Sequence, residues 1–299
     1  MTKPILVMMS FRGGERLRRC LASIAMSEGH FQRILLSITA EQDAVDMQVA
    51  LDFQAKHPRV EVLCTGQELP TMAHQAFWVD YLKGSGARAT DWIYWLAYDD
   101  EVLNQGIEQV VNPDGSWPLQ LDTAYFGPWS MRHESPDHLW NGDPNKDLQV
   151  WTSFPKGGPN RLPILTWIRQ QLHQPTYMQM SGSLIPFRNY LELKHGKPRK
   201  SGPMRIEMAT ALGTHTTHVQ ELAEPISTIY GRANSDRAAY GKQARKEDVH
   251  LLAWISRYSI KHPKALLDLG AILGQAFATQ IRIHIGRTSA PVEEWRERL

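Results

Sequence analysis

The chain has 299 residues, of which 42% are hydrophobic, so it can build one large α/β domain or two small ones around a buried core. Its 33 Lys and Arg residues against 31 Asp and Glu residues leave a formal charge of +2. This balance argues against nucleic acid as a partner, because such proteins neutralise many phosphates. Cys20 and Cys64 lack metal-ligand spacing and are expected to be reduced packing thiols.

The sequence shows no targeting or spanning segment. Residues 1–4 run directly into a short apolar stretch without a cleavage site, so no signal peptide is expected. No apolar run approaches the roughly 20 residues that cross a bilayer. We therefore expect a cytoplasmic protein, or one at the inner surface of the membrane.

Apolar runs and helical periodicity alternate through the first third of the chain. The run 5–9 predicts a strand buried on both faces, and an apolar stripe predicts a helix over 15–24. Further strands are predicted at 33–38, 60–64 and 92–97, and further helices at 44–55 and 70–82. This order is typical of right-handed crossovers in a parallel sheet.

The pattern changes after Val102. A strand is predicted at 121–127, and Pro, Gly, Trp and His are dense from 129 to 163, which is typical of functional loops. Helix signals return from Leu212, and the chain after Asp236 is predicted to be largely helical.

The predicted strand 92–97 runs straight into Tyr98-Asp99-Asp100-Glu101. Ligands of open α/β sheets bind at the carboxyl ends of strands. Neighbouring carboxylates repel each other unless a cation offsets them, and Mg²⁺ or Mn²⁺ takes one or two carboxylates and fills its other positions with phosphate oxygens and water. The turn therefore predicts a divalent-metal site for a diphosphate, with an exposed acidic turn that caps the next helix as the alternative.

The loop 10–14 follows the first predicted strand. Ser10, Phe11 and Arg12 could contact a nucleotide through backbone N–H groups, an aromatic face or a guanidinium, and Gly13 and Gly14 permit close approach. The alternative is a plain strand-to-helix turn.

Several segments, in order from about residue 3 to 237, resemble family 2 glycosyltransferases of the GT-A fold. Residues 3–24 are similar to the family's opening strand, nucleotide loop and Leu-x-x-Cys-Leu-x-Ser-Ile helix. Asp99-Asp100-Glu101 resembles its Asp-x-Asp-Asp element. Three later segments are similar to the acceptor-site entry, the catalytic-carboxylate segment and the Tyr…Asn-Ser ending, namely Met180–Pro186, Gly202–Glu207, and Ile229-Tyr230 with Asn234-Ser235.

The resemblance implies an α/β, GT-A-like (Rossmann-related) fold with a mostly parallel sheet flanked by helices. Residues 1–102 would form the nucleotide-sugar-binding half, 103–236 the acceptor-binding half, and 237–299 a helical C-terminal extension. The implied activity is inverting, divalent-metal-dependent transfer of a sugar from a nucleotide-sugar donor to a hydroxyl of a saccharide or lipid-linked acceptor. The implied cofactor is Mn²⁺ or Mg²⁺, and the implied pathway is bacterial surface polysaccharide synthesis.

The resemblance also implies roles for individual residues. Glu207 would be the general base, because an acceptor hydroxyl is a poor nucleophile until its proton is taken. Asp99 and Asp100 would hold the metal. The expected nucleotide contacts are Ser10, Phe11, Arg12, Thr39, Glu41, His74 and Asp99, and the weaker phosphate or acceptor candidates are Arg205, His215, His218 and Arg232.

Three positions depart from the family pattern. Ala97 replaces the first Asp of the Asp-x-Asp-Asp element, and the residue that reads the base after the second strand is left open among Thr39, Glu41 and Asp43. Arg232 stands near where a His is usual, and an Arg neutralises a diphosphate but does not ligate a metal. A nucleotidyltransferase and a catalytically silent carbohydrate-binding protein of the same fold are therefore alternatives.

The segment 265–278 is rich in apolar and small residues and lies between basic ones. It is predicted to pack on the catalytic domain or a second subunit, or to lie peripherally at a membrane surface.

Overall fold

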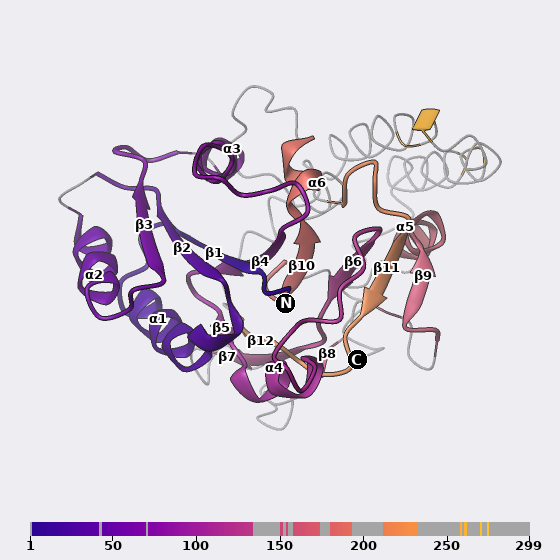
Figure 1. Ribbon diagram of the computed structural model, residues 1–299, viewed down its shortest axis with the longest axis horizontal. Helices are drawn as coiled ribbons and strands as arrows, with labels where there is room; N and C mark the ends of the chain where they lie inside the picture. The colour runs from indigo at the N-terminus through magenta and orange to yellow at the C-terminus, as the bar shows by residue number, and fades with distance from the viewer. Residues whose placement is uncertain are drawn as a thin grey trace, which may run out of the picture.

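The computed structural model describes residues 2–41, 44–69, 71–133, 150–151, 154, 158–173, 180–192 and 212–231, and the single positions 258, 260, 261, 270 and 274. Two β-sheets organise this part of the chain, a large central one and a smaller one beneath it (Figure 1).

The central sheet has eight strands in the order β3-β2-β1-β4-β10-β6-β11-β9. They are β1 (Ile5–Ser10), β2 (Arg33–Ile38), β3 (Val60–Cys64), β4 (Trp92–Ala97), β6 (Thr123–Phe126), β9 (Arg161–Pro163), β10 (Ser183–Pro186) and β11 (His218–Glu221). Strands β1 to β4 are parallel, β10 is antiparallel to both β4 and β6, β11 is parallel to β6, and β9 is antiparallel to β11. Because two antiparallel steps restore direction, β6 and β11 run the same way as β4.

Helices cover both faces of this sheet (Figure 1). One face packs against α1 (Glu15–Ser27), α2 (Val45–Gln54) and α4 (Asn104–Val110), and the other against α3 (Thr71–Gly84), α5 (Ile164–His173) and α6 (Phe187–Leu191). A short 3-10 helix, η1 (Glu28–His30), follows α1.

Strand β1 is continuously apolar from Ile5 to Met9 because both of its faces are buried. Ile5, Val7 and Met9 point into the core under α3 and α5, while Leu6 and Met8 point into the core under α1, and all five are at most 7% exposed. A strand buried on both faces has no solvent side to alternate with. The predicted fold class, a mostly parallel sheet flanked by helices, is confirmed.

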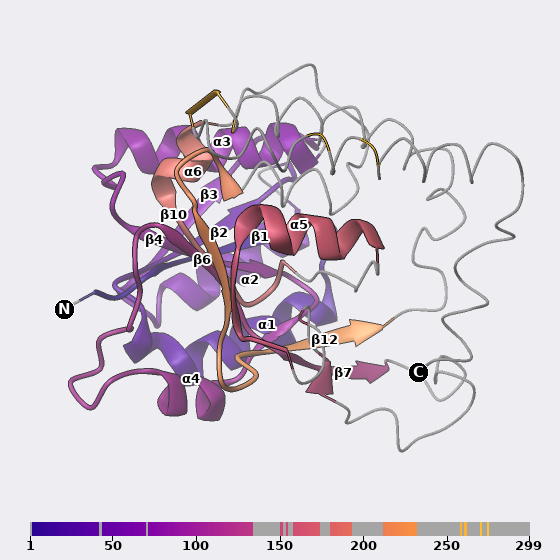
Figure 2. The same ribbon diagram turned by 90° about the vertical axis from the view of Figure 1, so that its right-hand side faces the viewer.

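The second sheet has the order β5-β12-β7-β8, with β5 (Glu101–Val102), β12 (Ser227–Gly231), β7 (Trp129–His133) and β8 (Val150–Trp151). Strand β12 is antiparallel to β5 and parallel to β7, and Figure 2 shows β12 and β7 running side by side away from the central sheet. Only the turn 98–100 separates β4 from β5. The acidic turn is therefore the junction between the two sheets.

Several predicted bounds agree with the structure, including the strands at 33–38, 60–64 and 92–97. The helix signals read from Leu212 onward are wrong up to Gly231, because this stretch contains β11 and β12. Val219 of β11 is fully buried between β6 and β9, so pairing in the sheet overrides local helical preference.

The described positions of the C-terminal extension are helical. Tyr258 is 4% exposed in the core with α5 and α6, and Lys261 Nζ donates to Thr214 Oγ1 over 2.7 Å. These contacts agree with packing on the domain built around the central sheet, while contact with a membrane or a second subunit stays a prediction. Among the described helices, none combines the length and apolar character of a membrane span. Both cysteines are free, as expected.

Helix α4 meets the chain before β12 at a glycine. A Cβ added to Gly106 would lie 1.7 Å from the Pro225 carbonyl oxygen, so Gly106→Ala forces backbone to move. We expect the free energy of unfolding to fall by about 3 kcal/mol, measured by urea denaturation. Gly84→Ala, where nothing lies within 4 Å, is the matched control and should not be destabilised. Equal stability of the two variants would contradict this packing.

Candidate functional site

The carboxyl ends of β1, β2 and β4 meet at one edge of the central sheet. Tyr98 N–H donates to the Met9 carbonyl over 3.1 Å, and Thr39 N–H donates to the Ser10 carbonyl over 3.0 Å. Gly13 lets the first loop pack on the acidic turn, since a Cβ there would meet the Tyr98 ring at 3.0 Å. The first loop, the end of β2 and the acidic turn therefore form one continuous surface.

Asp100 holds the acidic turn to two other parts of the chain. It is only 3% exposed, and its carboxylate accepts hydrogen bonds from Ser181 Oγ at 2.5 Å and from Tyr230 N–H at 3.2 Å. Ser181 Oγ also accepts the Ala97 N–H at 3.1 Å. Asp100 thus joins the end of β4 to the chain before β10 and to β12.

Glu101 is held by a cation and a phenol. Arg19 Nε of α1 lies 3.3 Å from Glu101 Oε1, and Tyr230 Oη donates to the same oxygen over 2.8 Å. The guanidinium carbon of Arg19 lies 3.5 Å from the centroid of the Tyr230 ring, and another Arg19 nitrogen donates to the Asp99 carbonyl over 3.0 Å. Arg19 lies off the apolar stripe of its helix, so its position in the sequence gives no signal of these contacts.

The donor set of the turn fits a hard divalent cation that is shared with a ligand. Asp99 is partly exposed and adjoins the buried Asp100. Within the described residues, no three His, Cys, Asp or Glu side chains gather into an all-protein metal cage. Mg²⁺ and Mn²⁺ need only one or two carboxylates when phosphate oxygens and water complete the shell.

Asp46, in the first turn of α2, holds the loop after β1 in place through hydrogen bonds. Its carboxylate accepts hydrogen bonds from Ser10 Oγ at 3.2 Å, Gly13 N–H at 2.5 Å and Gly14 N–H at 3.0 Å, and Asp46 is 7% exposed. The N–H groups of Gly13 and Gly14 are therefore engaged within the protein, and contact of Ser10 with a nucleotide stays a prediction. An acidic residue in the first turn of a helix is common, and its sequence position does not indicate a bond to a loop 33 residues away.

Phe11 and Arg12 present side chains to solvent at this edge. Phe11 is 42% exposed, and the Arg12 guanidinium lies 5.1 Å from its ring centroid. Arg12 also pairs with Glu68, in the loop after β3, at 2.8 Å. Contact of Phe11 and Arg12 with a nucleotide stays a prediction, as does contact of the exposed Glu41.

Thr39 and His74 serve packing instead. Thr39 Oγ1 accepts the Leu69 N–H at 2.6 Å and is 2% exposed, so it fixes the loop after β3. His74 is 2% exposed and lies 2.7 Å from Ser37 Oγ, and burial lowers the pKa of His74 to about 4. Neither side chain is accessible to an arriving nucleotide, which corrects the expectation for both.

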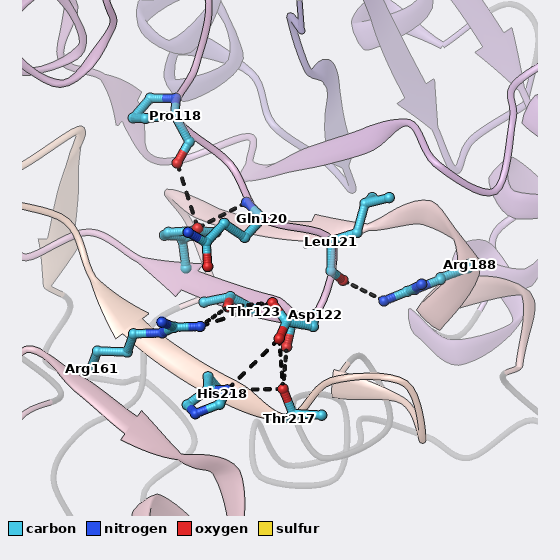
Figure 3. A network of polar contacts seen from close by, with 10 residues as sticks. Pro118, Gln120, Leu121, Asp122, Thr123, Arg161, Arg188, Thr217 and His218 are labelled. Carbon is cyan, nitrogen blue, oxygen red and sulfur yellow. Dashed lines mark hydrogen bonds and ion pairs between the residues drawn. The ribbon is translucent and has the colours of Figure 1, made fainter.

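His215 and His218 lie at the opposite edge of the sheet. Strand β11 runs parallel to β4, and His218 is its first residue whereas Asp99 follows the last residue of β4. Figure 3 shows His218 with Thr217 and Asp122 before β6, where Thr217 Oγ1 donates to the Asp122 carboxylate over 3.0 Å. His215 pairs with Glu192 at 2.6 Å. Neither histidine therefore lies at the edge where the acidic turn would bind a phosphate, which corrects that expectation.

Glu221, a carboxylate that no sequence pattern indicated, ends β11 at the same edge as the acidic turn. In register it is level with Phe126 of β6, which is level with Ser183 of β10 and so with Trp95 of β4. Burial raises the pKa of Glu221 to about 7. Its type and strand position carried no signal that distinguished it from other charged residues. Arg205, Glu207, Arg232 and Asp43 lie outside the described residues.

The sequence matches no protein-family model and no curated protein. Solved structures do resemble it. TarS 1–349 from S. aureus in complex with UDP-GlcNAc superposes with a TM-score of 0.62 at 9% identity, over 99% of this chain and 78% of the TarS fragment. The UDP complex of TarS gives 0.58 at 10% identity, over 93% and 72%. GalNAc-T7 with UDP, GalNAc and Mn²⁺ gives 0.51 at 10% identity, over 78% and 45%. This likeness shows the fold, which is GT-A-like.

His74 makes a testable contribution to the pH dependence of stability. Its folded-state pKa of about 4 lies below its ordinary value of 6.5, so the unfolded chain takes up a proton that the folded chain rejects. Stability should therefore fall as the pH drops from 6.5 toward 4, by about 2 kcal/mol from this group between pH 7 and pH 5. Urea unfolding of the wild type and His74→Gln measures it. Parallel pH profiles of the two proteins would contradict the assignment.

Proposed function

We propose that the chain is a glycosyltransferase that moves a sugar from a nucleotide-sugar to a hydroxyl of a saccharide or lipid-linked acceptor, with inversion and with Mn²⁺ or Mg²⁺ as cofactor. One observation carries the proposal: consecutive carboxylates leave β4 at the ligand-binding edge of a GT-A-like sheet, beside the exposed Phe11 and Arg12. That other proteins of this fold hold UDP-GlcNAc, or UDP with Mn²⁺, supports it.

The acidic turn would bind the donor through a divalent cation. Asp99 would hold the cation, with Asp100 beside it, and the bound cation would neutralise the diphosphate leaving group. Phe11 would stack on the base, and Arg12 would attract the phosphates once its pair with Glu68 opens. Both residues stand on a loop that Asp46 holds rigid, which limits the entropy lost when a nucleotide binds.

Acceptor activation would fall to Glu207, by its resemblance to the catalytic-carboxylate segment. Arg205 is two residues away and would hold that carboxylate ionised or bind phosphate. In-line attack of the deprotonated hydroxyl on the anomeric carbon inverts its configuration without a covalent sugar-enzyme intermediate. The resemblance further suggests a role in bacterial surface polysaccharide synthesis.

The nucleotidyltransferase alternative is weakened by the first loop. Such an enzyme needs loop N–H groups to cradle phosphates, and here Gly13 and Gly14 donate theirs to Asp46. A catalytically silent carbohydrate-binding protein would release no nucleoside diphosphate from the donor, whereas a glycosyltransferase would. Release of free nucleoside diphosphate when donor and acceptor are both present distinguishes the transferase from both alternatives.

Substitution of Asp99 should affect metal-dependent UDP binding, whereas substitution of Asp100 should affect the stability of the fold. Asp99→Asn removes a proposed ligand, so UDP binding in the presence of Mn²⁺ should weaken by at least about tenfold with the melting temperature unchanged. Asp100→Asn offers an amide to the Ser181 hydroxyl and the Tyr230 N–H, so the free energy of unfolding should fall by about 2 kcal/mol. Calorimetry and thermal unfolding measure the two effects. UDP binding by Asp99→Asn that equals the wild type would remove Asp99 from the metal site.

Glu207→Gln keeps the side-chain shape and removes its basicity. Turnover should fall by about 10²-fold or more, with donor affinity almost unchanged. Glu221→Gln is the matched comparison, because Glu221 is a carboxylate that the structure places at the same edge as the acidic turn. Normal turnover in Glu207→Gln combined with loss in Glu221→Gln would move the base to Glu221.

A further inference from the structure

Arg19 lies on α1, off the apolar stripe that packs into the core. Its neighbours Cys20 and Leu21 are buried under the sheet, and the Arg19 side chain itself is 33% exposed. It reaches the acidic turn from one side and the ring of Tyr230 from the other. The proposed function assigns no role to Arg19 or to Tyr230.

Arg19 interacts differently with the acidic residues of the turn: it pairs with the side chain of Glu101 but with the backbone of Asp99. Glu101 is committed to Arg19 and to the Tyr230 hydroxyl, and its side chain is only 18% exposed. The bond from Arg19 to the Asp99 carbonyl fixes the backbone at the residue proposed to hold the metal. Arg19 therefore both lowers the negative charge of the turn and sets its backbone.

We propose that Arg19, stacked on Tyr230 and paired with Glu101, is a positioning residue that keeps Glu101 away from the metal and orients the turn for a metal-bound diphosphate. This inference rests on the proposed function. The formal charge of Asp99, Asp100, Glu101 and Arg19 together is −2 when Arg19 is present and −3 without it. Without Arg19, a third carboxylate is released beside the cation.

The two effects of losing Arg19 have opposite signs, which makes the inference testable. In Arg19→Gln, Mn²⁺ alone should bind about threefold more tightly, because the turn gains net negative charge. UDP in the presence of Mn²⁺ should bind about tenfold more weakly, because the turn is no longer held for the diphosphate. Unbound Mn²⁺ is measured by electron paramagnetic resonance, and UDP binding by calorimetry.

Three further variants serve as controls. Arg19→Gln/Glu101→Gln restores the charge of −2 and should return the Mn²⁺ affinity to the wild-type value. Arg19→Lys keeps the charge but loses the planar stacking and fork geometry, so Mn²⁺ affinity should stay normal while UDP binding weakens. Arg18→Gln removes the adjacent, exposed charge that pairs with Glu15, and should leave both affinities unchanged.

A merely structural role predicts a different pattern. If Arg19→Gln weakens Mn²⁺ and UDP binding together and lowers the melting temperature, the inference is overturned. If Arg19→Gln does not fold, Arg19→Lys decides, because weakened UDP binding with normal Mn²⁺ affinity supports the inference and unchanged UDP binding overturns it. A wild-type protein that binds neither Mn²⁺ nor UDP overturns the proposed function and the inference with it, whereas wild-type binding with unaltered variants overturns the inference alone.

Discussion

Mutual repulsion among three consecutive carboxylates is the constraint on which the site depends. Asp99, Asp100 and Glu101 occupy the only link between β4 and β5, so the chain cannot spread them apart without separating the two sheets. The structure offsets their charge locally. Hydrogen bonds from Ser181 and Tyr230 satisfy Asp100, and Arg19 with the Tyr230 hydroxyl satisfies Glu101. The same contacts join α1, β10 and β12 to one point.

The fold was largely readable from the sequence because burial leaves a strong periodic signal. Strand β1 is apolar from Ile5 to Met9 because its side chains pack into the cores on both faces of the sheet, and the apolar residues of α1 are spaced to lie on one helix face. Strands β11 and β12 were not recognised, because short strands in a mixed sheet take their conformation from partners distant in sequence. His218 pairs across to Thr123 and Pro163, and Ser227 to Val102 and Trp129.

Site residues could be predicted from the sequence only where polar residues directly follow a predicted strand. Asp99 and Asp100 directly follow the apolar strand β4, so their position at the end of that strand could be predicted from neighbouring residues alone. The structure places them at the expected edge of the sheet. Asp46 and Arg19 form hydrogen bonds with segments far away in the sequence, so the residues next to them do not indicate these partners. The expectation for His218 failed because the sequence alone does not show that this residue begins strand β11, at the edge opposite the acidic turn.

Metal-dependent binding of the donor at the acidic turn can be tested with a crystal of the wild-type protein grown with UDP and Mn²⁺, with data collected at the manganese absorption edge. We expect one anomalous peak within coordination distance of the Asp99 carboxylate and of the UDP diphosphate, with Glu101 still paired to Arg19. UDP bound at the opposite edge of the sheet, beside Asp122 and His218, or UDP bound at the acidic turn with no manganese peak, would contradict it.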